Sequence, residues 1–274
     1  MRKTVLIIAA MAMLASGCGN RCAKGGTDCK ETLAASVEGA RDVPEAEPVA
    51  AAQSSPASDP IDKENFVLVS DVIPDVILEI RYFSTYNFIG DRIPGYEQPV
   101  AILTRQAADS LKAVSDELLA QGYRLKIFDA YRPQCAVDYF VKWAKDHNDV
   151  RMKEYFYPEL EKSSIIPEGY ISTRSKHTHG STVDLTLFDM ASEREVDMGC
   201  TYDYFGLASH PGLLPGQEAG GYKPIDEQQY AARMLLRNTM MKHGFKPISS
   251  EWWHFTLKDE PFPDTFFNFP VTSF

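Results

Sequence analysis

A change in composition near Pro60 separates a segment that cannot form a hydrophobic core from one that can. Between Gly19 and Pro60 the chain consists mainly of Ala, Ser, Pro, Glu and Gly, with almost no large apolar side chains. Such a segment buries too little apolar surface to offset the entropy lost on ordering it. We therefore predict a flexible tether over residues 18–60 and one folded domain over residues 61–274.

The overall composition narrows the class of protein. Hydrophobic residues make up 44% of the chain and charged residues 24%, which is the balance of a soluble globular protein. The formal net charge is −10, and no stretch of the sequence is rich in Lys and Arg. Because neutralising phosphates requires clustered basic side chains, we expect no nucleic-acid partner.

The first 18 residues have the pattern of a bacterial export signal. Two basic residues precede an apolar run from Val5 to Leu14, and small residues lead from this run to Cys18. The run is shorter than the roughly 20 apolar residues that span a bilayer. Its end resembles a lipobox, which implies removal of residues 1–17, a lipid on Cys18 and a membrane-anchored lipoprotein in the cell envelope, in the periplasm. A plain secretory signal with an incidental cysteine is the alternative.

Hydrophobic periodicity predicts three helices and several short strands in the folded part. Thr104 is a typical helix N-cap, and apolar residues recur after it at helical spacing until Gly122. The other elements are helices over residues 134–146 and 226–243 and strands over residues 124–128, 183–187 and 245–248. Because regular βαβ spacing is missing, we predict an α+β fold, a single domain with a small central antiparallel or mixed sheet flanked by helices.

Two segments carry the residue types of a catalytic metal site. One runs from Ser175 to Asp184 and includes His177, and the other runs from Glu251 to Phe255 and includes His254. Neutral imidazoles and carboxylates are the ligands of catalytic zinc, which uses three protein ligands and keeps one position open for water. The helical His-Glu-x-x-His pattern is absent, so the ligands must come from separate segments. Taken singly, either segment could equally be a turn or part of the core.

A third segment, Asp129 to Pro133, follows a predicted strand and precedes a predicted helix. Its guanidinium, on Arg132, allows two interpretations. It could be a structural group that pairs with a carboxylate, or it could project into a cleft, where its fixed donors suit a developing oxyanion.

The three segments together resemble the D-alanyl-D-alanine dipeptidases of the VanX type, in the M15 group of zinc peptidases. The family patterns Ser-x-His-x-x-Gly-x-x-x-Asp, Glu-x-Trp-His and Tyr-Arg-Pro occur at Ser175 to Asp184, Glu251 to His254 and Tyr131 to Pro133. An aromatic-Asp-x-Phe element occurs at Tyr202 to Phe205, and the run from Asn87 to Gly90 also fits the dipeptidase branch. The likeness extends from about Asn65 to Phe274.

This resemblance implies three zinc ligands, a general base, a transition-state stabiliser, a partner for the substrate ammonium and a further substrate contact. In that order the residues are His177, Asp184 and His254; Glu251; Arg132; Asp203; and Ser175. It also implies one zinc ion per chain and hydrolysis of the D-alanyl-D-alanine dipeptide by a zinc-activated water. A buried carboxylate that pairs with the free amine would disfavour longer peptides, which lack an amine at that point.

Two other functions remain open from the sequence. A D,D-carboxypeptidase or endopeptidase that trims peptidoglycan stem peptides would carry the same metal motifs. A non-catalytic binding lipoprotein could keep the fold and the metal, although Glu251 argues against it because binding alone needs no general base.

Cysteines and a third histidine near these motifs also leave alternatives. Cys135 and Cys200 each lie three residues from a proposed site residue, so they could form a disulfide or remain two buried thiols. His179 follows His177 closely, and we expect it to support the site or lie at the surface, because Asp184 already completes the ligand set.

Overall fold

The computed structural model describes residues 61–274, which lie in one compact unit. The predicted signal peptide, Cys18 and the tether over residues 18–60 lie outside the described residues. Within the described part, no helix combines the length and apolarity needed to cross a membrane.

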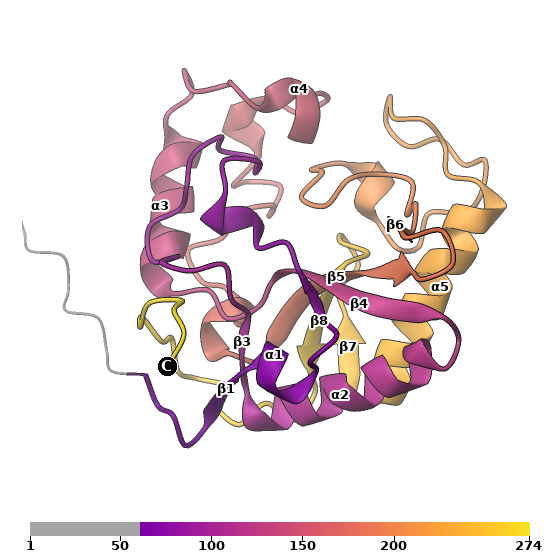
Figure 1. Ribbon diagram of the computed structural model, residues 1–274. Helices are drawn as coiled ribbons and strands as arrows, with labels where there is room; N and C mark the ends of the chain where they lie inside the picture. Colours follow the sequence, from indigo (N-terminus) through magenta and orange to yellow (C-terminus); the bar gives the residue numbers. More distant parts are fainter. Residues whose placement is uncertain (1–60) are drawn as a thin grey trace, which may run out of the picture. The chain divides into compact units, whose positions relative to one another are not determined.

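A mixed sheet forms the centre of the domain (Figure 1). Its strands, in spatial order, are β2 (Ile77–Leu78), β4 (Tyr123–Asp129), β5 (Thr182–Asp189), β8 (His254–Leu257) and β7 (Phe245–Pro247). All neighbours in this order are antiparallel except β2 and β4, and β6 (Arg194–Glu195) also pairs with β5. A separate antiparallel pair joins β1 (Phe66–Leu68) to β3 (Ile102–Thr104).

Within residues 61–274, three long helices accompany the sheet. They are α2 (Arg105–Leu119), α3 (Gln134–Lys145) and α5 (Glu227–Lys242). Helix α2 packs against β4 and against α5, and α5 packs against β7; in Figure 1, α2 runs beneath the sheet. The remaining helices are short: α1 (Val69–Val72), α4 (Lys153–Phe156), and the 3₁₀ turns Arg81–Phe83, Lys162–Ser164, Lys176–His179 and Leu207–Ser209.

Local signals explain where the long helices begin and end. The Thr104 side chain accepts a hydrogen bond from the backbone of Ala107 and caps α2. Helix α5 starts with a capping box, in which the side chains of Asp226 and Gln229 each accept a hydrogen bond from the other residue's backbone N–H. It ends before Gly244, whose φ of 89° suits glycine. The predicted helices and the α+β class with a mixed sheet are confirmed.

The two cysteines of the folded part are free thiols, so the disulfide considered between them does not form. The thiol of Cys135 lies 3.9 Å from the Pro94 carbonyl, whereas that of Cys200 lies 3.3 Å from the Ala208 carbonyl. Each thiol therefore packs in its own surroundings. The alternative of two buried thiols is confirmed for the free state of both and for the burial of Cys200, whereas Cys135 is only half-buried.

Candidate active site

Strand register places three of the polar residues in one row across the sheet. Asp129 on β4 is the pairing partner of Asp184 on β5, and Asp184 is in turn the partner of His254 on β8. Directly opposed side chains on neighbouring strands lie within contact distance of one another. His177 joins this row from the 3₁₀ turn that precedes β5. Residues that are far apart in the sequence are thus gathered by backbone pairing.

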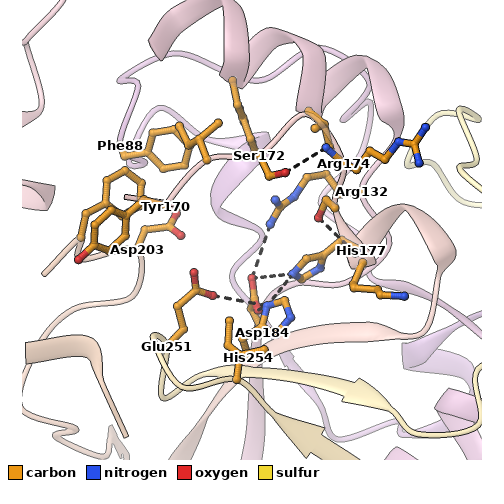
Figure 2. Close-up of a pocket in the computed structure, with 18 of the residues that line it drawn as sticks. Phe88, Arg132, Tyr170, Ser172, Arg174, His177, Asp184, Asp203, Glu251 and His254 are labelled. Atoms are coloured by element: carbon orange, nitrogen blue, oxygen red, sulfur yellow. Dashed lines mark hydrogen bonds and ion pairs between the residues drawn. The ribbon is translucent and has the colours of Figure 1, made fainter. Parts of the chain in front are cut away.

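His177, Asp184 and His254 form a compact group of possible metal ligands. One ligand atom from each lies within 4.8 Å of the others, and all three side chains are buried. The two imidazoles approach to 3.2 Å, between Nε2 of His177 and Nδ1 of His254. The Asp184 carboxylate lies 3.3 Å from the first of these nitrogens and 3.1 Å from the second. Figure 2 shows the three side chains converging at one end of a cavity.

The donor atoms of this cluster fit a divalent cation. Nδ1 of His177 lies 2.7 Å from the Ala130 carbonyl, which can only accept, so in the neutral ring this nitrogen carries the proton and Nε2 offers a lone pair to a metal. Asp184 Oδ1 is buried and receives no well-oriented hydrogen bond from the described residues. Burial by itself would raise the pKa of Asp184, but the charge and hydrogen bonds that the two imidazoles supply in their protonated form outweigh it and hold that pKa well below its usual range. Two imidazoles and a carboxylate are a ligand set suited to catalytic zinc.

Glu251 stands beside the cluster. One oxygen of its carboxylate lies 3.5 Å from Nδ1 of His254, and 22% of its side chain is exposed. Burial, with a smaller contribution from the charge of Asp184, raises the pKa of Glu251 to about 6. A carboxyl group whose pKa lies close to neutral pH can both accept and return a proton, which is the property of a general base.

Arg132 fits both interpretations that the sequence left open, because it pairs with a carboxylate and also faces the cavity. Its Nε and one terminal nitrogen each lie 2.9 Å from Asp129, a carboxylate that also accepts a 2.6 Å hydrogen bond from Tyr96. The same terminal nitrogen is 3.7 Å from Asp184 and the side chain lines the cavity. Arg132 is therefore fixed by a buried structural ion pair, and it still presents its guanidinium to the site.

A second carboxylate, that of Asp203, lines the same cavity. The residue is 6% exposed, and the Tyr82 hydroxyl lies 3.0 Å and 3.2 Å from its two oxygens. Burial, reinforced by the charge of Asp184, raises the pKa of Asp203 well above its ordinary value. The backbone at Asp203 is left-handed, with φ of 62°, a conformation that aspartate tolerates better than most residues. In Figure 2, Asp203 lies across the cavity from the histidines.

The cavity between these groups is small. It holds about 260 Å³, below the roughly 300–1,000 Å³ typical of pockets for drug-sized ligands. Aromatic side chains line much of it: Tyr82, Phe88, Phe140, Tyr170 and Phe205. The site is therefore sized for a small substrate with polar or charged groups.

Ser175 and His179 lie near the cluster and have structural contacts. The Ser175 hydroxyl accepts a hydrogen bond from the backbone of His177 and so caps the turn that carries it; Ser175 also lines the cavity. Nδ1 of His179 lies 3.2 Å from a carboxylate oxygen of Glu260, and the ring is buried. His179 is not a member of the cluster of possible ligands.

Comparison with known proteins identifies the family. The family model of Peptidase M15, described as D-ala-D-ala dipeptidase, matches residues 62–272. The chain belongs to the M15 peptidase family. Curated D-alanyl-D-alanine dipeptidases match this M15 peptidase over most of its length: one from Enterococcus faecalis is 35% identical, covering 77% of this chain and all of the relative. One from Enterococcus faecium is 34% identical over 75% of this chain and 98% of the relative.

Another curated D-alanyl-D-alanine dipeptidase, from Streptomyces coelicolor, is 32% identical over 76% of this chain and 98% of the relative. Among solved structures, the M15 peptidase is similar to the vancomycin-resistance D,D-pentapeptidase VanY in complex with Zn(II). That likeness covers 58% of this chain and 74% of the other, with 15% identity and a TM-score of 0.34.

Sequence reasoning missed the residues that hold the polar groups of this M15 peptidase in place. Asp129 begins one of the recognised segments, but the sequence alone suggested no function for Asp129, Tyr82 or Tyr96. Their partners lie far along the chain: 33 positions separate Tyr96 from Asp129, and 121 separate Tyr82 from Asp203. Periodicity and local motifs carry no signal for contacts at such distances.

Proposed function

We propose that this M15 peptidase is a zinc-dependent D-alanyl-D-alanine dipeptidase. One observation carries the proposal: the cluster of possible zinc ligands and the buried carboxylate of Asp203 line opposite parts of one small cavity. A free dipeptide is a zwitterion with an ammonium at one end, and Asp203 is placed to pair with it. The names of the curated relatives support the same substrate.

The proposed zinc ligands are His177, Asp184 and His254, for the reasons of geometry and protonation given above. A zinc ion bound there would lower the pKa of its water to about 7 and polarise the scissile carbonyl. Side chains that line the cavity would supply the remaining steps, which are proton transfer, stabilisation of the oxyanion and binding of the substrate.

Glu251 would take a proton from the attacking water, whose oxygen bonds to the carbonyl carbon. It would then deliver this proton to the amide nitrogen as the carbon–nitrogen bond breaks, so that the second D-alanine leaves as an amine. The pKa of about 6 allows both transfers. Arg132, fixed by Asp129, would donate hydrogen bonds to the oxyanion as its charge develops.

Asp203 would bind the substrate ammonium, with Tyr82 holding the carboxylate in place. A blocked or extended substrate has no cation at this point and would leave the carboxylate unpaired. Ser175, at the cavity wall, is proposed as a further contact with the dipeptide.

The direct test is hydrolysis of D-Ala-D-Ala, an L,L-dipeptide and a stem pentapeptide by the purified protein, with chelator and with zinc restored. The dipeptidase should cleave D-Ala-D-Ala in a zinc-dependent manner and leave the pentapeptide largely intact. Preferential cleavage of the pentapeptide would replace this function with a D,D-carboxypeptidase. Zinc binding without hydrolysis of any substrate would favour a non-catalytic binding protein.

We also propose that the enzyme is a lipoprotein of the cell envelope, anchored through Cys18. The basic residues, the short apolar run and the small residues before Cys18 support this. Cys18→Ser should release the protein from membranes or block its maturation, as followed by fractionation and mass. A wild-type mature protein found only in the soluble fraction would contradict the anchor.

A further inference from the structure

The Tyr202 hydroxyl connects the two ends of the cavity. It lies 3.0 Å from Oδ2 of Asp184 and 3.1 Å from the Tyr82 hydroxyl. The Tyr82 hydroxyl lies within hydrogen-bonding distance of both oxygens of Asp203. A chain of four oxygen-bearing groups therefore runs from the proposed zinc ligand to the proposed ammonium partner. Tyr202 has no place in the hydrolysis described above.

We propose that Tyr202 is a positioning residue for the metal ligand Asp184. Its hydroxyl donates to Oδ2 and so fixes the rotation of the carboxylate, with Oδ1 turned toward Nδ1 of His254. This inference rests on the proposed function only for its zinc ion. Its consequence is a change in zinc affinity, which can be measured without any substrate.

The two oxygens of Asp184 have different surroundings, as this function requires. Oδ1 is buried without a well-oriented hydrogen bond from the described residues and lies 3.1 Å from Nδ1 of His254. Oδ2 receives the Tyr202 hydroxyl. A carboxylate with one oxygen held by a donor and the other left free is prepared to give a single oxygen to a metal.

Other polar neighbours of Oδ2 do not replace Tyr202. Nε2 of His177 is 3.3 Å away, but in the neutral ring that binds a metal it carries the lone pair, because Nδ1 donates to the Ala130 carbonyl. The nearest nitrogen of Arg132 is 3.7 Å away, beyond a hydrogen bond, and is engaged by Asp129. The phenol has one proton and two acceptors, Asp184 and Tyr82. A hydrogen bond to the charged acceptor is the stronger of the two.

The ring of Tyr202 is held firmly enough to position another group. It is 1% exposed and stacks on Phe128, with ring centroids 4.7 Å apart and an angle of 21° between the planes. Trp253 meets it edge to face at 5.3 Å. Because the ring itself is clamped, Tyr202→Phe should keep its packing and lose only the hydroxyl.

Tyr204→Phe is a matched control, two residues along the same segment. Tyr204 is 2% exposed, and its hydroxyl is a buried atom without a hydrogen-bond partner among the described residues. Both substitutions therefore remove one buried phenol oxygen. Only Tyr202→Phe removes a donor to Asp184.

The experiment measures the zinc dissociation constant of the full-length protein by competition with a chromophoric chelator. Removing a group that orients a metal ligand commonly costs about 10- to 100-fold in affinity, so Tyr202→Phe should raise the constant by that factor and Tyr204→Phe should not. The zinc-induced rise in Tm is a second measurement, and it subtracts any change in the stability of the zinc-free protein. The rise should be smaller for Tyr202→Phe than for either the wild type or the control.

Tyr82→Phe tests the Asp203 end of the chain of oxygen-bearing groups separately from the Asp184 end. It removes the donor to Asp203 but leaves the bond from Tyr202 to Asp184, so zinc affinity should stay near the wild-type value while KM for D-Ala-D-Ala rises. A zinc constant for Tyr202→Phe within about threefold of the Tyr204→Phe value, less than 1 kcal/mol, would overturn the inference. If the wild type does not bind zinc or cleave the dipeptide, the proposed function fails instead, which the wild-type controls reveal.

Discussion

Asp203→Asn tests whether this carboxylate recognises the free amine of the substrate. The substitution keeps the size of the side chain and an oxygen that can still accept from Tyr82. It removes the negative charge at a position that is 6% exposed. A bound dipeptide would then bury its ammonium without a counter-charge.

The expected fall in kcat/KM follows from the burial of Asp203. Removing one partner of a buried ion pair costs about 3–5 kcal/mol, and each 1.36 kcal/mol is about a factor of ten in rate. The pKa of Asp203 is raised by burial, so part of the pairing energy is used to ionise the carboxyl group before it binds. We therefore expect the lower end of the range, a fall of about 100-fold in kcat/KM for D-Ala-D-Ala.

The assay compares the wild type and Asp203→Asn on two substrates, so that the loss of the carboxylate and the loss of the cation can be measured separately and together. D-alanine release is measured from D-Ala-D-Ala and from its N-acetylated form, which keeps the scissile bond and lacks the cation. The wild type should prefer the free dipeptide by at least about tenfold, and Asp203→Asn should bring the two substrates close to parity. Equal zinc content in both proteins is the control. An undiminished preference in the variant would refute the pairing, and a wild type that cleaves both substrates equally would favour a D,D-carboxypeptidase.

Three further substitutions test separate parts of the structure. Glu251→Gln should leave the zinc content near normal in elemental analysis while kcat falls about 10²- to 10⁴-fold; loss of zinc would make Glu251 a ligand instead. Asp129→Asn removes the carboxylate that Arg132, with 12% of its side chain exposed, contacts at 2.9 Å and leaves only Asp184 at 3.7 Å; urea unfolding should show a loss of about 3 kcal/mol, the lower end of the range for a broken buried pair, whereas an unchanged midpoint would contradict the pairing. Gly180→Ala adds a methyl group against a packed aromatic ring at a φ of 79°, so thermal unfolding should reveal a loss of about 2–6 kcal/mol. Gly212→Ala, where no atom lies within 4 Å, is its control, and equal losses in the two variants would refute this reasoning.

The helices of this fold could be predicted because their signals are local. Thr104, Asp226 and Gly244 mark helix ends through contacts with residues a few positions away, and amphipathic spacing marks the lengths. The short strands are harder to predict from the sequence. Strand β8 has four residues and pairs with β5 about 70 positions earlier, and β1 and β3 have three residues each. Segments of this length contain too few residues for a period to be recognised.

The residues of the site also fall into two groups, those that a local motif predicts and those that only the tertiary structure reveals. Residues that touch the proposed metal and substrate fall in short motifs that resemble those of a known family, and the structure brings His177, Asp184 and His254 together. The residues that hold them do not form motifs. Tyr202 stands beside Asp203 in the sequence, yet its contact with Asp184 spans 18 positions and joins two separate segments. Such contacts follow from tertiary packing, which a single sequence does not display.

Strand β5 couples the hydrophobic core to the proposed metal site. Val183, Leu185 and Leu187 belong to the core and alternate with Thr182, Asp184 and Thr186, so the two sets lie on opposite faces of the sheet. A slip of one residue would move the apolar set out of the core and turn Asp184 away from His254. The register that buries the apolar side chains is thus also the register that assembles the ligands. Zinc binding to the folded form should in turn stabilise this strand pairing, because a ligand that binds only the native state raises its stability.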